Sequence, residues 1–527
     1  MKMLSTTYKL TLAAAAAALF GSCSEDIMDR INNDGNHAHE VEAKFMMPDL
    51  IASTAFYNIG SDLTYYPSTY IEYEVGVEGQ MHNAETRNGE PSASSTTDNT
   101  WKNQYNSLKN ARIIISQCAP GKLDEDNDVT KGMAEVMAAY NGALLTDAYG
   151  NTPYSQAALT DENGLPVYLT PKIDTQESIY EDVLTLLDDA IDDLKKSDRS
   201  PVGSYDLLYE GDADKWIKFA YGLKARYTMH LLHRSANQQA DLQNVLSYIE
   251  QSFQSADEQA AFSIYDGATQ QNPLYAYFDA RSGLACSQSL VNKLSERNDP
   301  RLSRVFLSPS DQNGVRHQVT DKNDPNLKAA PNGEAEQSTT KYAVSAFMYA
   351  GSAPTLLLSY HELLFIKAEA LQRLNDPSAE DALKAAVAAG IANAENSVKS
   401  AIKVAGSSVD ITANEMTQAV AEAYFDNDVQ PLYAQNPLKE IMIQKYFALW
   451  GASGEAFESY NDMRRFNAMN NGTDMYALEN PLNADGKFPL RLPYGNSDVS
   501  ANPEVKKAYG NGQYVYTENV WWAGGSR

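Results

Sequence analysis

The sequence predicts a mainly helical protein that carries long irregular loops. Three observations support this fold class. Apolar residues recur every three or four positions in six separate segments, which is the spacing of a buried helix face. Between these segments lie stretches rich in Gly, Ser, Asn and Pro that also contain many aromatic residues. Helical segments recur in pairs at intervals near the roughly 34 residues of a tetratricopeptide repeat, although no repeat consensus is clear.

The N-terminus has the layout of a bacterial signal peptide over residues 1–22. Two lysines precede an apolar stretch, Leu10 to Phe20, which is shorter than the roughly 20 residues that span a bilayer. Small residues then precede Cys23, as in a lipobox, although Phe20 stands where Leu is usual. We therefore expect Cys23 to be lipidated and to begin the mature chain. The alternative is an ordinary secretory signal with an incidental cysteine.

A tether and one domain are expected after the signal. Residues 23–44 are polar and predict a flexible connection between the lipid and the fold. Residues 45–527 are expected to form a single helical domain with loop insertions at about 60–100, 263–356 and 470–527. The aromatic content of these insertions argues against disorder, and long ordered loops are usually functional.

Six helical segments follow one another along the domain. The first begins after a suitable N-cap, Asp98, and the second ends at Gly150, a C-cap signal. The third has an apolar stripe on one face and four aspartates on the other. The apolar stripes cover Trp101–Ile115, Met133–Tyr149, Leu184–Leu194, Trp216–Tyr227, Leu357–Leu371 and Leu438–Leu449.

Composition excludes some classes of function. The chain has 42 Lys+Arg against 69 Asp+Glu, a net charge of −27, which argues against a nucleic-acid partner because phosphates need a basic patch. Only Cys118 and Cys286 accompany Cys23, too few for a disulfide scaffold. We interpret them as unpaired thiols, while their spacing is equally compatible with a disulfide.

Catalytic motifs are not found. The sequence contains no G-x-S-x-G, P-loop or dinucleotide-binding G-x-G-x-x-G. His361 and Glu362 begin an H-E-x-x pattern, but Phe365 replaces the second zinc ligand, so His361 is interpreted as a core histidine. His230 and His233 lack a nearby third ligand. No carboxylate pair stands out for glycoside hydrolysis, so we predict no catalytic residue, metal or cofactor. A glycoside hydrolase that acts through two of the many carboxylates is the less favoured alternative.

An acidic segment resembles a calcium loop in its spacing. Asp124, Asp126 and Asp128 are followed by Glu135. A calcium loop needs Gly at its sharp turn, where this chain has Val129, and Glu135 falls within a predicted helix. The segment is therefore interpreted as a solvated acidic loop.

Tyrosine is unusually frequent, with 32 Tyr against 15 Phe and 5 Trp. A tyrosine ring offers a flat apolar face and a hydroxyl, which suit a sugar ring and its hydroxyl rim. Neighbouring Asn, Asp and Arg side chains would bind sugar hydroxyls. The same surface suits a peptide, and the alternative is that these tyrosines only pack loops onto helices. The predicted ligand-binding residues, in two loop-like regions, are Tyr65, Tyr66, Tyr70 and Tyr73, and Asn272, Tyr275, Tyr277, Asp279 and Arg281.

Taken in order, several short motifs resemble the SusD/RagB-type outer-membrane lipoproteins of the Bacteroidetes. Each motif is weak alone, but their order and spacing over nearly the whole mature chain are specific. The motifs are Trp101–Tyr105, Asp147–Tyr154, Tyr180–Leu194, Gly211–Phe219, Asn298–Leu302, Ser359–Ala370, Gln444–Trp450, Met463–Arg465, Arg491–Tyr494 and Asn502–Pro503.

The resemblance implies an all-α fold of about four tetratricopeptide-like helix pairs, with a loop-rich irregular capping region and few short strands. It also implies a lipid-anchored protein at the cell surface of the outer membrane, which captures an oligosaccharide or glycan and delivers it to a TonB-dependent, SusC-like barrel. Glu25 and Asp26 resemble the family's surface-export signal. Some members bind peptides, and neither a reaction nor a cofactor is implied. Ligand residues differ between members, so none is carried over by motif.

Overall fold

The computed structural model describes residues 41–88, 92, 98–161, 164–470, 472, 474–510 and 512–527. The predicted signal peptide and Cys23 lie outside these residues. By its internal contacts the chain divides into two units, Met1–Glu42 and Ala43–Arg527. All of the described helices and strands lie in the second unit, whose first helix, α3 (Ala43–Ser53), begins two residues before the predicted start of the domain at residue 45.

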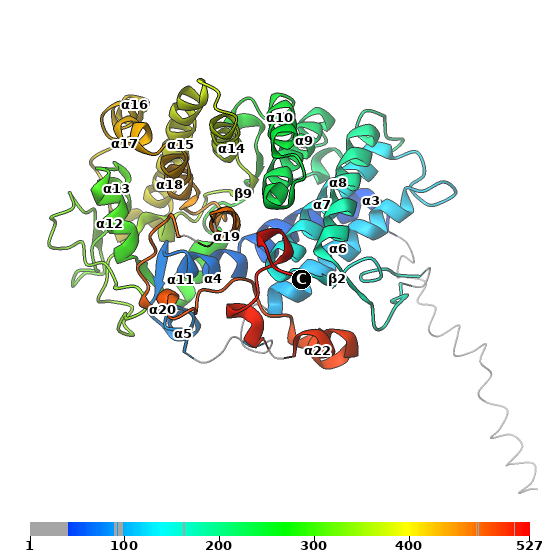
Figure 1. Ribbon diagram of the computed structural model, residues 1–527, viewed down its shortest axis with the longest axis horizontal. Coiled ribbons are helices and arrows are strands. Elements are labelled where there is room, and N and C mark those ends of the chain that lie inside the picture. The colour runs from blue at the N-terminus through cyan, green and yellow to red at the C-terminus, as the bar shows by residue number, and fades with distance from the viewer. Residues whose placement is uncertain are drawn as a thin grey trace, which may run out of the picture. The chain divides into compact units, whose positions relative to one another are not determined.

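Eight longer helices form the scaffold, and each packs against the next along the chain, with α18 also against α14 (Figure 1). This series of antiparallel neighbours is the predicted all-α architecture of paired helices. The helices are α6 (Asp98–Gln117), α7 (Asp128–Tyr149), α8 (Gln176–Asp193), α9 (Ala213–His230), α10 (Gln238–Glu250), α14 (Tyr360–Arg373), α15 (Ala379–Ala405) and α18 (Pro437–Leu449).

Side chains fix where several of these helices begin. Thr175, Asp212 and Ser359 each accept a hydrogen bond from a first-turn backbone N–H, at the starts of α8, α9 and α14 respectively. Such caps satisfy amide groups that have no partner inside the helix. At the other end of α7, Gly150 takes a positive φ of 74° and stops the helix, as the sequence predicts.

Shorter helices surround the scaffold. The helices α4 and α19 pack directly on each other, and in Figure 1 α4, α5 and α11 lie below α14 and α18. These helices are α4 (Asp62–Tyr70), α5 (Gly79–Glu85), α11 (Pro273–Arg281), α12 (Gln288–Glu296), α13 (Arg301–Val305), α16 (Gln418–Tyr424), α17 (Gln430–Gln435), α19 (Ala456–Met469), α20 (Pro481–Ala484), α21 (Asn496–Ala501) and α22 (Pro503–Tyr509).

The β-structure in the described residues is limited to five two-stranded sheets. Four are antiparallel and one, β7 with β10, is parallel. The pairs are β1 (Glu74–Gly76) with β5 (Leu284–Cys286), β2 (Thr152–Pro153) with β3 (Ile173–Asp174), β4 (Ala260–Phe262) with β9 (Thr355–Leu358), β6 (Phe306–Leu307) with β8 (Val344–Ser345), and β7 (Arg316–His317) with β10 (Val409–Asp410).

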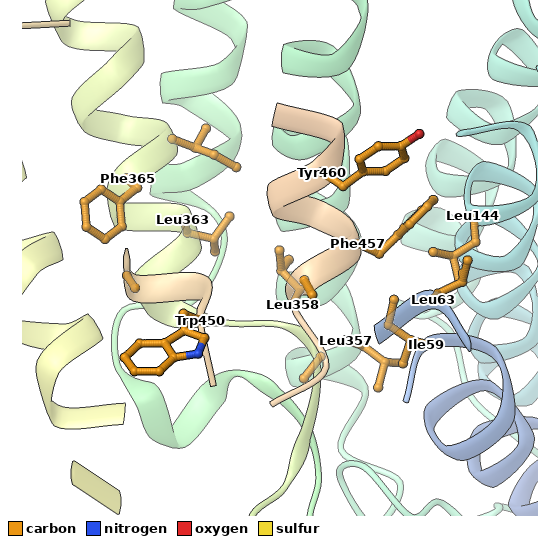
Figure 2. Packing of buried hydrophobic residues seen from close by; sticks show 14 of the residues in the cluster. Ile59, Leu63, Leu144, Leu357, Leu358, Leu363, Phe365, Trp450, Phe457 and Tyr460 are labelled. Atoms are coloured by element: carbon orange, nitrogen blue, oxygen red, sulfur yellow. The ribbon is translucent and has the colours of Figure 1, made fainter. Parts of the chain in front are cut away.

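One large apolar cluster joins the helices to the β9 strand. Figure 2 shows Leu357 and Leu358 of β9 among side chains from several helices, including Leu63 of α4 and Phe457 of α19. The sequence places Leu357 in the stripe of a helix, and this is wrong. Leu357 lies in the strand, and the helix starts only after the Ser359 cap.

Two further properties of the described residues concern membrane-spanning helices and cysteines. Within the described residues, no helix combines the length and apolar character needed to cross a bilayer. Cys118 and Cys286 are both buried and unpaired, in agreement with the preferred interpretation of the sequence.

Candidate functional site

Most of the predicted tyrosines lie on helices rather than in loops, and Tyr73 lies in the turn after α4. Tyr65, Tyr66 and Tyr70 belong to α4, and Tyr275 and Tyr277 belong to α11. The loop prediction fails for α4 because every residue from Leu63 to Tyr70 is buried. A helix that is buried on all sides has no polar face, and therefore no visible 3.6-residue stripe.

The structure brings the two clusters together. The Tyr65 ring stacks on the Tyr277 ring, with centroids 4.4 Å apart and planes inclined by 29°. The Tyr65 hydroxyl donates to the backbone oxygen of Pro273, the first residue of α11, at 2.9 Å. A Cβ at Gly283 would lie only 2.9 Å from the Tyr277 hydroxyl, so a glycine there permits this packing. Residues more than 200 positions apart in the chain thus share one surface.

Charged and polar groups border the stacked rings. Asp62, at the start of α4, accepts a hydrogen bond from Thr100 of α6 at 3.2 Å. Burial raises the pKa of Tyr66, Asp62 and Tyr277 raise it further, and Arg281 lowers it. Burial raises the pKa of Tyr277 to about 12. We call Asp62, Tyr65, Tyr66, Tyr277 and Arg281 the tyrosine site.

The groups of the tyrosine site differ in their access to a ligand. Tyr66 is buried, at 4% exposure, and its hydroxyl forms no hydrogen bond within the described residues. Arg281 is exposed and forms no ion pair with any described residue. Tyr277 is half-buried, so part of its ring remains open. An aromatic face, a hydroxyl and a guanidinium are groups that bind a sugar ring and its hydroxyls.

Tyr70 and Tyr73 lie in the core, away from this surface. Tyr73 is 1% exposed, and its hydroxyl bonds to the Tyr446 backbone oxygen and to Ser459 Oγ. Tyr70 is 5% exposed and packs beside Tyr66 and Tyr460. These two follow the alternative interpretation of the sequence, in which tyrosines pack the chain.

Asn272 has a structural role at the start of α11. Its Oδ1 accepts from the backbone N–H of Leu274 and Tyr275, and its Nδ2 donates to the carbonyls of Ala353 and Ala452, each at 2.9 Å. It is fully buried. Its hydrogen-bonding groups are thus all used to position the helix that carries Tyr277.

The remaining predicted residues flank the site on the outer face of α11. Tyr275 is half-buried, and burial raises its pKa, with Asp279 and Tyr349 adding to the shift. Asp279 is exposed. Sequence reasoning missed Asp62 and Thr100, because their relation to the tyrosines arises only where α6 crosses α4.

The other candidate catalytic or metal-binding residues mostly have structural roles. His361 is buried and its Nε2 lies 3.1 Å from Glu455, as expected for a core histidine. The prediction that Asp124 lies in a solvated loop is wrong. Its side chain is 3% exposed and accepts a hydrogen bond from the backbone N–H of Ala43 at 2.9 Å. Within the described residues, no group of three or more His, Cys, Asp and Glu side chains could hold a metal ion.

Comparison with known proteins identifies the family. Residues 39–494 match a SusD-like family model that is described as starch-binding and associating with the outer membrane. The chain belongs to the SusD-like family. This family, also called SusD/RagB, consists of outer-membrane proteins that bind nutrients and glycans and are not enzymes. The resemblance inferred from the sequence motifs is confirmed.

Solved structures support this SusD-like assignment. A SusD/RagB family protein from Bacteroides thetaiotaomicron shares 56% identity and a TM-score of 0.88, over 93% of this chain and 100% of that one. A chitin-binding protein shares 22% identity and a TM-score of 0.65, over 91% and 99% of the two chains. An outer-membrane protein of Bacteroides vulgatus assigned to nutrient binding shares 18% identity and a TM-score of 0.69, over 92% and 100%.

The two more distant structures share the fold alone with this SusD-like chain. A comparison with curated proteins found no significant match.

Proposed function

We propose that this SusD-like protein captures an oligosaccharide at the cell surface and delivers it to a TonB-dependent, SusC-like outer-membrane barrel. Family membership is the observation that carries the proposal. The tyrosine site supplies a suitable binding surface, since a sugar ring can stack on the half-buried Tyr277 while the exposed Arg281 binds its hydroxyls. A family described as starch-binding makes glucose polymers the first ligands to test.

The ligand test is calorimetric titration with maltohexaose, chitohexaose and a tryptic peptide digest. Tyr277→Ala and Arg281→Ala should each weaken oligosaccharide binding by about tenfold, or about 1.4 kcal/mol. Tyr205→Ala is the matched control, because Tyr205 is 43% exposed and lies outside the tyrosine site. Binding of peptides but of neither sugar would replace glycan with peptide as the cargo. Wild-type affinity in both site variants would remove these residues from the site.

We further propose that a lipid on Cys23 anchors the chain to the outer membrane. Cys23→Ala should move the full-length protein from the membrane fraction to the soluble fraction, because a lipid chain supplies the hydrophobic attachment. Cys118→Ala is the control, since Cys118 is buried in the fold. Membrane attachment that survives Cys23→Ala would contradict the anchor. The barrel partnership fails if no large outer-membrane barrel purifies with the wild-type chain.

A further inference from the structure

A hollow lies beside the N-terminal half of α6, and no part of the tyrosine site lines it. Its volume is about 420 Å³, within the range of small-ligand sites. Three parts of the chain form its walls: α6, α21, and between them in sequence residues 153–158 and 166–171. Convergence of distant segments on one concavity is typical of a binding site rather than of a surface irregularity.

The inner wall of the hollow is held rigidly. Trp101 is 1% exposed, and its indole N–H donates to Asp498 Oδ2 at 2.5 Å. Its ring lies against Tyr105, 5.1 Å away between centroids. The Tyr105 hydroxyl donates to the Pro153 backbone oxygen at 2.7 Å. These polar groups are already paired, so the wall does not need to rearrange when a ligand enters.

The outer rim, in contrast, is open and apolar. Twelve large hydrophobic side chains are exposed in the described residues, and four of them lie together: Leu165, Val167, Tyr168 and Leu169, at 61%, 50%, 45% and 84% exposure. Tyr168 and Leu169 line the hollow itself. A concentration of exposed apolar side chains next to a cavity marks a binding site.

Backbone hydrogen bonds hold this rim in place. The N–H of Asp161 donates to Leu165 O at 2.8 Å, and the N–H of Val167 donates to Leu159 O at 3.0 Å. At the far end, Asn502 Nδ2 donates to Pro171 O at 2.8 Å. Backbone contacts on both sides of Tyr168 therefore hold it in place, which lowers the entropic cost of using it in binding.

Polar groups on the walls of the hollow remain free for a ligand. The Asn106 amide, the Ser497 hydroxyl and the Tyr168 hydroxyl all line it, and none forms a side-chain hydrogen bond within the part of the chain that the structure describes. Burial raises the pKa of Asp498, whose Oδ2 is held by Trp101. An exposed aromatic face bordered by an amide and hydroxyls matches the alternating apolar and hydroxylated surfaces of a pyranose ring.

We propose that this hollow is a second sugar-binding subsite, in which a pyranose ring stacks on Tyr168 and its hydroxyls bind Asn106 and Ser497. The inference rests on the proposed glycan-binding function. The two sites are neighbours: Thr100 bonds to Asp62 of the tyrosine site, and the next residue on α6, Trp101, lines the hollow. The protein would then bind an oligosaccharide on two sides of one helix.

The test is binding of the purified full chain to an array of malto-, chito-, xylo- and manno-oligosaccharides of three to seven units. Tyr168→Ala should weaken binding of the recognised sugars at least fivefold, and Asn106→Ala should weaken it in the same direction. Tyr205→Ala is matched to Tyr168 in exposure, at 43% against 45%, and should bind like the wild type. Melting temperatures should match that of the wild type, because neither the Tyr168 nor the Asn106 side chain forms a hydrogen bond within the described chain.

The outcomes separate this inference from the proposed function. If the wild type binds a sugar and Tyr168→Ala binds it equally well, the second subsite is overturned while the proposed function stands. If Tyr168→Ala weakens binding and Tyr277→Ala does not, the second subsite is supported and the tyrosine site is removed. If the wild type binds no sugar on the array, both the proposed function and the subsite are overturned.

Discussion

At the scale of single residues, several acidic side chains are buried at a free-energy cost. Glu74 in β1 is 3% exposed, and its Oε1 accepts hydrogen bonds from Ser345 Oγ and Trp450 Nε1, each at 3.1 Å. Its Oε2 has no hydrogen-bond partner among the residues that the structure describes. Burial therefore raises the pKa of Glu74 to about 8, because an apolar environment disfavours the charged form.

Glu74→Gln tests this cost through the pH dependence of unfolding. Since the folded pKa of Glu74 lies above its ordinary value of 4.5, its contribution to stability is complete below about pH 4.5 and is lost as the pH rises through about 8. The neutral glutamine avoids that loss. We expect Glu74→Gln to unfold like the wild type at pH 4.5 and to be more stable by roughly 5 kcal/mol at pH 9, since each unit of the raised pKa corresponds to about 1.4 kcal/mol. Urea titrations at both pH values measure this, and equal stability at pH 9 would show that Glu74 is not buried as a neutral acid.

At the scale of elements, short helices position the candidate site. The helix α11 starts at Asn272, whose side chain caps the first turn and also holds the carbonyls of Ala353 and Ala452. The same helix then presents Tyr277 to Tyr65. The placement of the tyrosine site therefore depends on one buried amide.

Asn272→Ala should destabilise the protein by about 2–4 kcal/mol, because it removes the cap and leaves two buried carbonyls without donors. Asn237→Ala is the matched control: Asn237 caps α10 through Ala240 at an exposed position, and its loss should cost about 1 kcal/mol. Chemical denaturation compares the two variants. If both variants lose the same free energy of unfolding, the hydrogen bonds from Asn272 to the Ala353 and Ala452 carbonyls contribute nothing to stability.

The elements also show what the sequence could predict. The stripes of α6 and α8 follow from one-sided burial, which imposes a 3.6-residue period. The helices α7 and α18 are buried on nearly all sides, so their apolar residues, and for α7 the Gly150 cap, indicate a helix without a polar face. The helix α4 escapes detection because it is buried all round and contains Pro67. Leu357 fits the stripe of α14 by spacing alone, yet pairing of β9 with β4 places it in a strand. The stacking of Tyr65 on Tyr277 was not predictable, because no local pattern encodes a contact across more than 200 residues.

At the scale of the whole molecule, a buried network of charges joins distant helices. His230 of α9 lies between Asp147 of α7, 3.2 Å from its Nδ1, and Glu458 of α19, 2.6 Å from its Nε2. Arg226 lies 3.8 Å from the same Glu458, and Trp522 near the C-terminus donates to Asp147 at 2.8 Å. The two carboxylates raise the pKa of His230 to about 9 despite its burial.

Stability should therefore fall in alkaline solution. The folded pKa of His230 lies above its ordinary value of 6.5, so its contribution is complete below about pH 6.5 and is lost as the pH rises through about 9. The loss should be about 3 kcal/mol, and His230→Gln should remove this part of the pH dependence while being less stable at pH 6.5. His233→Gln is the control, because burial and Arg234 lower the pKa of that half-buried histidine. If the stability of His230→Gln depends on pH as steeply as that of the wild type, the alkaline loss of stability comes from other titratable groups.

The sequence by itself determined the helical scaffold, the family and the class of function. One-sided burial leaves a periodic signal, and short motifs in a fixed order identify the SusD-like family. Only the tertiary structure decided which tyrosines are enclosed, that α4 and α11 form one surface, and that α6, α21 and residues 153–158 and 166–171 surround a hollow. Such features depend on contacts between segments that are far apart in the chain, and the free energy of these contacts is not encoded in any local pattern of residues.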